Sequence, residues 1–140
     1  MRPERNNYTD FEEELVVLPE EVSISSGNGK TVLFKHDYYS SDNDYGRQLL
    51  YTFIRSMMSD PDLIGCAIFV DSAVQLMTGN DPEINEFLEF LSAGGKTVYV
   101  SSESMEQYSV DEHFGQGVQI VTDSIIAEML ICHTPELIIE

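Results

Sequence analysis

The sequence is short of positive charge. Among its 140 residues, 7 lysines and arginines stand against 25 aspartates and glutamates, which gives a formal net charge of −18 at pH 7. Nucleic acids and anionic membrane surfaces are bound mainly through Lys and Arg side chains, which neutralise phosphate groups. We therefore expect neither a nucleic acid nor a membrane surface as a partner.

Cysteines and long apolar segments are also scarce. The two cysteines, Cys66 and Cys132, can form neither a disulfide framework nor a four-thiolate zinc site. No apolar run approaches the roughly 20 residues that a membrane-spanning helix needs. Residues 1–7 are not followed by the apolar core of a signal peptide. The composition predicts a soluble, cytoplasmic protein with reduced thiols.

What the sequence does contain is enough apolar material for one packed domain, since 42% of its residues are hydrophobic. Residues 1–30 differ from the rest, because the acidic cluster 12–14 precedes the short apolar run 15–18. We expect an acidic N-terminal arm over residues 1–30, in which Leu15 to Ile24 forms either an edge strand or a mobile tail. An α/β domain over residues 31–140 follows.

From residue 31 onward, short apolar segments alternate with segments of helical periodicity. This alternation is typical of parallel strands joined by helical crossovers. The pattern predicts a five-stranded, mostly parallel sheet with helices on both faces, a three-layer α/β sandwich of flavodoxin-like size. The predicted strands are Thr31–Lys35, Ile64–Val70, Lys96–Ser101, Gly117–Val121 and Glu136–Ile139.

Apolar side chains at helical spacing predict the helices between these strands. The first helix carries its stripe from residue 49 to residue 58, and Asp42 or Asn43 suits its N-cap. The second has Asp81 as N-cap and Pro82 at the first helical position, and the glycines at 94 and 95 end it. The last opens near residue 122 or 123, and one short helix fits between residues 102 and 109. The buried stripes of the second and last helices are predicted to be Ile84, Phe87, Leu88 and Leu91, and Ile125, Ile126, Met129 and Leu130.

Polar side chains follow three of the predicted strands at their carboxyl ends. In open parallel sheets, ligands bind at this edge. We therefore expect a polar pocket there, and its net negative lining favours a cation or a polar neutral molecule. Its candidate lining residues are His36, Asp37, Asp71, Ser72, Ser101, Ser102 and Glu103.

Neither a metal site nor a cofactor is predicted. The aspartates at 37, 42 and 44 offer hard oxygen ligands for magnesium or calcium, but acidic side chains at this place also suit a helix N-terminus. No two histidines have the i, i+4 spacing of a helical metal site. A serine hydrolase would need His36 or His113 as the base, and the sequence has no G-x-S-x-G nucleophile elbow.

Two segments carry a family resemblance. One is Ile68–Leu76, which an acidic helix follows as far as residue 91, and the other is Gly94–Val100. Together with the order of the elements, they resemble the DsrE-like family, most closely the C-terminal half of YedF-type proteins. The acidic, glycine-containing segment Asp42–Leu50 is similar to the start of that family's first helix. The resemblance covers residues 31–140 and implies a DsrE-like fold, sulfurtransferase-like activity, a role in sulfur or selenium metabolism, and a homo-oligomer.

The resemblance also implies where sulfur would be carried. In YedF-like relatives the loop after the third strand has cysteines in a C-x-x-C-like arrangement, and a DsrE-like carrier takes its persulfide on a cysteine in this region. Those positions fall on Ser101 and Ser104 here. A serine hydroxyl is protonated at pH 7 and forms no persulfide, so any carrier activity would have to use Cys66 or Cys132.

From these residues we expect a DsrE/YedF-like domain without the loop cysteines that acts as a non-catalytic oligomeric or regulatory subunit. Its expected partner is a second copy of itself or another protein. The alternative is a small-ligand-binding α/β domain that uses the polar pocket at the strand ends.

Overall fold

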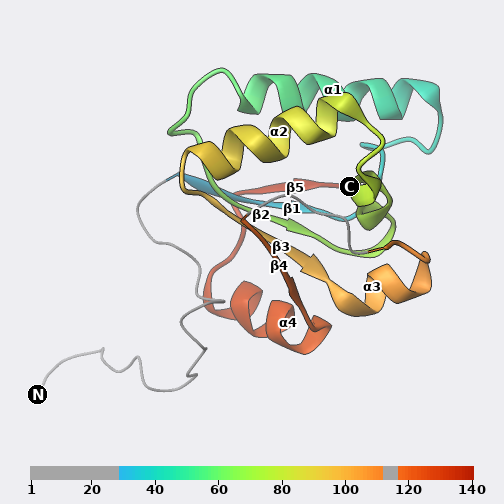
Figure 1. Cartoon of the computed structure of the whole chain (residues 1–140), viewed down its shortest axis with the longest axis vertical. Coiled ribbons are helices and arrows are strands. Elements are labelled where there is room, and N and C mark those ends of the chain that lie inside the picture. Colours follow the sequence, from blue (N-terminus) through green and yellow to red (C-terminus); the bar gives the residue numbers. More distant parts are fainter. Residues whose placement is uncertain (1–28, 112–116) are drawn as a thin grey trace, which may run out of the picture.

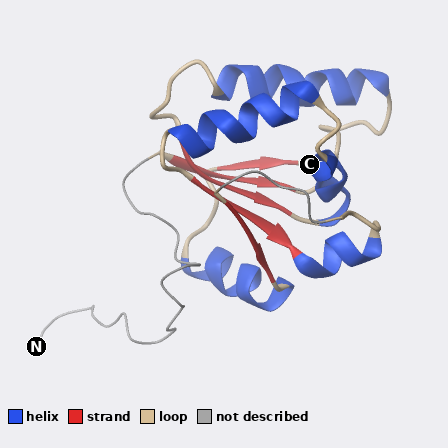
Figure 2. Cartoon of the chain, in the orientation of Figure 1, coloured by secondary structure: helices blue, strands red, loops and turns tan. Residues whose placement is uncertain are grey.

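Five parallel strands form the centre of the computed structural model, which describes residues 29–111 and 117–140. The strands lie in the order β4-β3-β2-β1-β5, and Figure 2 shows all of their arrows pointing the same way. The predicted sheet is confirmed, because each strand differs from its predicted bounds by no more than one residue at either end. Of the predicted N-terminal arm, residues 1–28 lie outside the described part, and Lys30 belongs to β1 instead. The strands are β1 (Lys30–Phe34), β2 (Ile64–Phe69), β3 (Thr97–Ser101), β4 (Val118–Val121) and β5 (Leu137–Ile139).

Helices cover both faces of the sheet, as predicted. Figure 1 shows α1 (Asp44–Met57) and α2 (Pro82–Ala93) side by side above the sheet, and α4 (Asp123–Cys132) below it. The short α3 (Ser102–Gln107) lies at the end of β3, and the 3₁₀ helix η2 (Asp71–Thr78) follows β2. The carboxyl ends of the strands therefore meet two short helices at one edge. In the described part of the chain, no helix is both long enough and apolar enough to cross a membrane.

Two separate cores lie on the two faces of the sheet, because successive strand side chains point in opposite directions. The core beneath α1 and α2 contains Phe34 and Phe69, whose rings stack with their centroids 4.6 Å apart. Phe87 of α2 meets the ring of Phe34 edge-on at 6.1 Å. The core beneath α4 contains Cys66 and Ile68 from the other face of β2.

The predicted helix starts are confirmed. The Asn43 side chain accepts a hydrogen bond from the Gly46 N–H at 2.9 Å, and Asp81 caps α2 with Pro82 at the first helical position. Gly46 also makes a close approach to the loop before α1, because a Cβ on it would lie 1.7 Å from the carbonyl oxygen of Ser41. Only glycine fits here, so the loop of residues 36–43 packs directly against the first turn of α1.

The structure corrects the sequence analysis at two elements. The predicted buried stripe of α4 is only half right: Ile126 and Met129 are buried, whereas Ile125 and Leu130 are half-buried. The reason is that α4 contacts the sheet with one side only. The second correction is η2, which no sequence pattern indicated because it follows a strand directly and has no side-chain N-cap.

Candidate functional site

The seven predicted pocket residues all lie at the carboxyl edge of the sheet, but in separate groups. His36 follows β1, and its Nδ1 lies 3.1 Å from the hydroxyl of Ser72 at the start of η2. The His36 ring also stacks on the ring of Tyr38, with centroids 4.7 Å apart. Ser101, Ser102 and Glu103 form a second group, where β3 passes into α3. In the described residues, no hydrogen bond joins the two groups directly.

Ser101 is the centre of the second group. It is the last residue of β3, it is fully buried, and it is the N-cap of α3. Its oxygen accepts a hydrogen bond from the Ser104 N–H at 2.9 Å, and its hydroxyl donates to the carboxylate of Asp123 at the start of α4. The Ser101 hydroxyl therefore has a partner both as donor and as acceptor.

Glu103 ties α3 to α4 a second time. Its carboxylate accepts a hydrogen bond from the Asp123 N–H at 2.8 Å and one from the Ser102 hydroxyl at 3.0 Å. The Asp123 N–H, as the larger cause, lowers the pKa of the Glu103 carboxyl below its usual range. Glu103 is thus a charged side chain in a structural role, since it holds the turn between β4 and α4.

Asp71 joins the two groups through α3. It has a left-handed φ of +54°, an uncommon and strained conformation for a residue other than glycine. Its N–H donates to the buried Ser104 hydroxyl at 2.7 Å, and its carboxylate accepts from the Tyr108 hydroxyl at 2.8 Å. These two hydrogen bonds, one donated to Ser104 in α3 and one accepted from Tyr108 just after it, hold the strained turn that begins η2.

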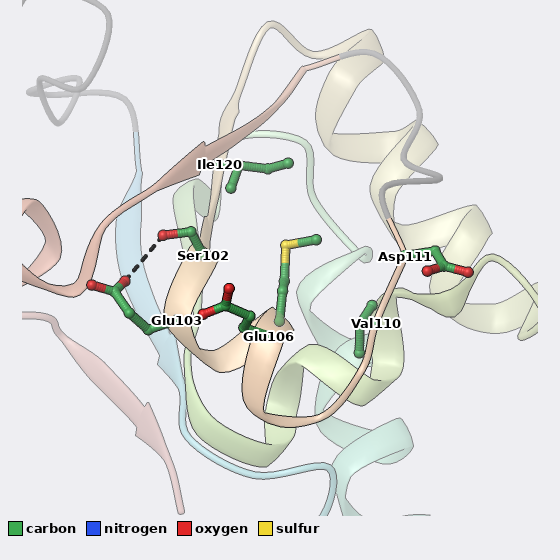
Figure 3. Close-up of a pocket in the computed structure, with 7 residues that line it drawn as sticks. Ser102, Glu103, Glu106, Val110, Asp111 and Ile120 are labelled. Carbon is green, nitrogen blue, oxygen red and sulfur yellow. Dashed lines mark hydrogen bonds between the residues drawn. The ribbon is translucent and has the colours of Figure 1, made fainter.

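Two surface hollows flank α3. One, of about 510 Å³, lies between α3 and β4, and Figure 3 shows its acidic and apolar side chains. The other, of about 410 Å³, lies between the start of η2 and α4. Of the seven predicted pocket residues, Ser102 and Glu103 line the first hollow and Asp71 lines the second. The full linings are Ser102, Glu103, Met105, Glu106, Val110, Asp111 and Ile120, and Val70, Asp71, Ser104, Asp123, Ile126, Ala127 and Leu130.

Neither of the two cysteines replaces the thiol that is missing at position 101. Cys66 is fully buried in β2, and burial raises the pKa of its thiol to about 12. Cys132 is exposed in the last turn of α4. It lies nine positions after Asp123, at the other end of this helix, which corresponds to about 14 Å along the axis.

Two of the aspartates that could have been metal ligands, Asp42 and Asp44, instead have local structural roles at the start of α1. Asp42 forms an ion pair of 2.9 Å with Arg47, and Asp44 lies in the first turn of α1. In the described residues, no group of three histidine, cysteine or acidic side chains is arranged to hold a metal ion.

Comparison with known proteins identifies the fold. No protein-family model matches the sequence, and the search of curated proteins found no match. Among solved structures, the YchN protein from E. coli aligns with a TM-score of 0.53 and 18% identity, over 79% of this chain and 97% of that one. MTH1491 from Methanobacterium thermoautotrophicum, a protein of unknown function, aligns with a TM-score of 0.53 and 15% identity, over 77% and 96%. At these identities the likeness establishes a DsrE-like α/β fold.

Proposed function

We propose that this chain is a DsrE-like subunit of the sulfur-relay type that carries no sulfur itself and works by association with other protein chains. One observation carries the proposal. The position that the family resemblance gives to a sulfur-carrying thiol is occupied by Ser101, which is fully buried and hydrogen-bonded both as donor and as acceptor.

The chemistry of sulfur transfer explains why this observation matters. A carrier needs a thiolate that attacks the donor's sulfur and then holds it as a persulfide. Ser101 has no sulfur atom, and a donor cannot reach it from solvent because its side chain is buried. The Asp123 carboxylate beside it would also repel the negative charge of a persulfide anion.

Neither of the two cysteines can carry sulfur at this edge of the sheet in place of a thiol at position 101. Cys66 keeps its proton at neutral pH, since its pKa is raised to about 12, and it is sealed beneath α4. Cys132 is accessible but lies at the far end of α4 from Asp123. Sulfur transfer by this chain would therefore have to proceed through Cys132.

Mass spectrometry tests the proposal directly. The purified full chain is incubated with a persulfide donor and its intact mass is measured, with Cys132→Ser as the matched control. We expect no adduct of about 32 Da, the mass of one sulfur atom, that can be passed to an acceptor thiol. A transferable adduct on the wild-type chain that is absent from Cys132→Ser would overturn the proposal.

A second candidate function is the binding of a small ligand in the hollow between α3 and β4. The hollow combines the carboxylates of Glu103, Glu106 and Asp111 with the apolar side chains of Met105 and Ile120, which suits a cation or a polar neutral molecule (Figure 3).

Thermal-shift screening against metal ions, nucleotides and flavins tests this second function. A ligand at 100 times its Kd stabilises the fold by about 2.7 kcal/mol, which is easily detected. We expect Glu106→Gln to abolish the shift and Glu89→Gln, on the exposed side of α2, to preserve it. If none of these compounds shifts the unfolding temperature, the ligand-binding function is rejected.

A further inference from the structure

His36 and Ser72 form a hydrogen-bonded pair that neither of the functions above uses. The Nδ1 atom of His36 lies 3.1 Å from the hydroxyl oxygen of Ser72. A serine becomes a nucleophile when a base lies within hydrogen-bond reach, about 2.6–3.2 Å, and can take its proton. His36 is one of the two histidines that a serine hydrolase would need as its base, and the structure places a serine beside it. The pair lies at the carboxyl edge of the sheet, where parallel α/β proteins bind their ligands.

A strained turn positions Ser72 at this edge. Asp71, with its left-handed φ, connects the end of β2 to η2, and its hydrogen bonds with Ser104 and Tyr108 hold it there. In hydrolases of the α/β class, the nucleophilic serine stands on a strained turn from a strand into a helix. Here the strained residue is the one directly before the serine. The side chain of Ser72 is half-buried, so a substrate can reach its hydroxyl from solvent.

The surroundings of the His36 ring suit a general base. The ring stacks on the ring of Tyr38, with an angle of 1° between the two planes, and this contact orients it. The Glu140 carboxylate is close enough to interact with the ring, since Lys35 and, to a smaller extent, His36 lower the pKa of that carboxyl. A nearby carboxylate stabilises the imidazolium that forms when a histidine takes the proton of a serine.

A backbone donor for the substrate oxygen is also present. Acyl transfer places negative charge on the carbonyl oxygen, and N–H groups beside the nucleophile stabilise that charge. The Asp71 N–H donates to Ser104. The Ala73 N–H donates to the carbonyl of Val70. Between them, the Ser72 N–H lies in the first turn of η2 and has no hydrogen-bond partner in the part of the chain that the structure describes.

We propose that Ser72 and His36 are the nucleophile and the base of an esterase site that hydrolyses small neutral or cationic esters. The Ser72 oxygen bonds to the acyl carbon, and the bond from that carbon to the alcohol oxygen breaks. The serine proton passes to Nδ1 of His36 and from there to the departing alcohol. Water then releases the acyl group as a carboxylic acid, with His36 again taking and returning a proton.

The charge around the pair sets the class of ester. The carboxylates of Asp37, Asp71 and Glu140 lie on or next to the two residues and would repel an anionic substrate. The proposed activity goes beyond the association proposed above and is independent of it.

Ester hydrolysis is the first test. The full chain, in a Cys132→Ser background that removes the exposed thiol, is mixed with para-nitrophenyl acetate, and the release of para-nitrophenolate is followed. We expect saturable turnover, and Ser72→Ala and His36→Gln should each lower kcat by at least about 100-fold. Ser92→Ala is the matched control, because Ser92 is also a half-buried serine but lies at the amino edge of the sheet. Its kcat should equal that of the background chain.

Covalent labelling is the second test, and it does not depend on whether a variant folds. A fluorophosphonate reacts with an activated serine, which displaces fluoride and keeps the phosphonyl group. After digestion, mass spectrometry should find this group on Ser72 of the native chain and on no serine of the chain labelled in denaturant. Turnover that persists in Ser72→Ala, a label on another residue, or the absence of any label would overturn the proposal. None of these outcomes bears on sulfur transfer, which the mass measurement above decides separately.

Discussion

Ser101 donates its hydroxyl hydrogen to the carboxylate of Asp123, and this contact joins the end of β3 to the start of α4. This contact determines the environment, and so the pKa, of a thiol placed at position 101. A cysteine there would be buried beside a negative charge, and both conditions disfavour a thiolate.

A restored cysteine at position 101 should therefore be a poor nucleophile. In a Cys132→Ser background, we expect the thiol of Ser101→Cys to have a pKa above the ordinary value of about 8.5. Adding Asp123→Asn should lower that pKa and speed alkylation by iodoacetamide at neutral pH. The measurement is the alkylation rate as a function of pH. A thiol pKa at or below 7 with Asp123 present would contradict the repulsion argued here.

The hydroxyl of Ser104 should contribute clearly to stability. It is the acceptor for the N–H of Asp71, whose backbone has the left-handed φ of +54°. Ser104→Ala leaves that N–H without its partner, and we expect the free energy of unfolding to fall by about 1–3 kcal/mol. Ser102→Ala is the control, because its half-buried hydroxyl donates only to the Glu103 side chain. Urea unfolding of the two variants at pH 7 should show a loss for Ser104→Ala that is clearly the larger.

Glu103 should make stability depend on pH in the acid range. Its folded-state pKa is lowered, mainly by the hydrogen bond from the Asp123 N–H. A depressed pKa contributes stability above the unfolded value of about 4.3, and this contribution is lost as the pH falls through the folded pKa. Glu103→Gln should therefore weaken the dependence of unfolding on pH between about 2 and 5. Glu106→Gln, one turn later on α3, should keep the wild-type profile; equal profiles for the two variants would exclude this role.

The two cysteines should differ sharply in reactivity. We expect one thiol per native chain, that of Cys132, to react quickly with a disulfide reagent, and both to react in denaturant. Cys66 stays protonated in the fold up to about pH 12, whereas the unfolded chain releases that proton near pH 8.5.

Stability should consequently fall in alkali. A raised folded pKa gives a contribution that is complete below the unfolded pKa and is lost as the pH rises toward the folded one. The Cys66 thiol alone gives a slope of up to about 1.4 kcal/mol per pH unit above pH 9. Unfolding free energies of the wild type and Cys66→Ala, measured from pH 8 to pH 10.5, should diverge in slope. Parallel slopes would contradict the burial of this proton.

The strands of the sheet could be predicted because each is marked by a pattern of neighbouring residues in the sequence. Each strand is a short run of apolar residues, and turn-forming or polar residues bound it. The helix starts followed equally local rules, as Asn43 and Asp81 show through their side-chain caps. By contrast, α4 has apolar residues on every side, so its sequence could not tell which of them face the sheet.

The sequence predicted at which edge of the sheet the candidate residues lie. It did not predict which side chains contact one another there. Topology placed His36 and Ser101 at the same edge, because the carboxyl ends of parallel strands meet there. The partner of Ser101, however, comes from α4, 22 positions further along the chain. The role of Asp71 also could not be predicted from the sequence, since its left-handed backbone is held by a hydrogen bond that it donates to Ser104 and one that it accepts from Tyr108. Such pairings are set by packing, which no local pattern reports.

The contact between Gly46 and the carbonyl of Ser41 offers a way to find relatives that share little overall similarity. Any side chain at this place would push the loop of residues 36–43 away from α1 and displace His36 and Tyr38 with it. A distant homologue that retains this arrangement must keep a glycine three positions after its N-cap. An evolutionary search can therefore use that spacing as an anchor when aligning sequences at the level of 15–18% identity seen for the two solved structures.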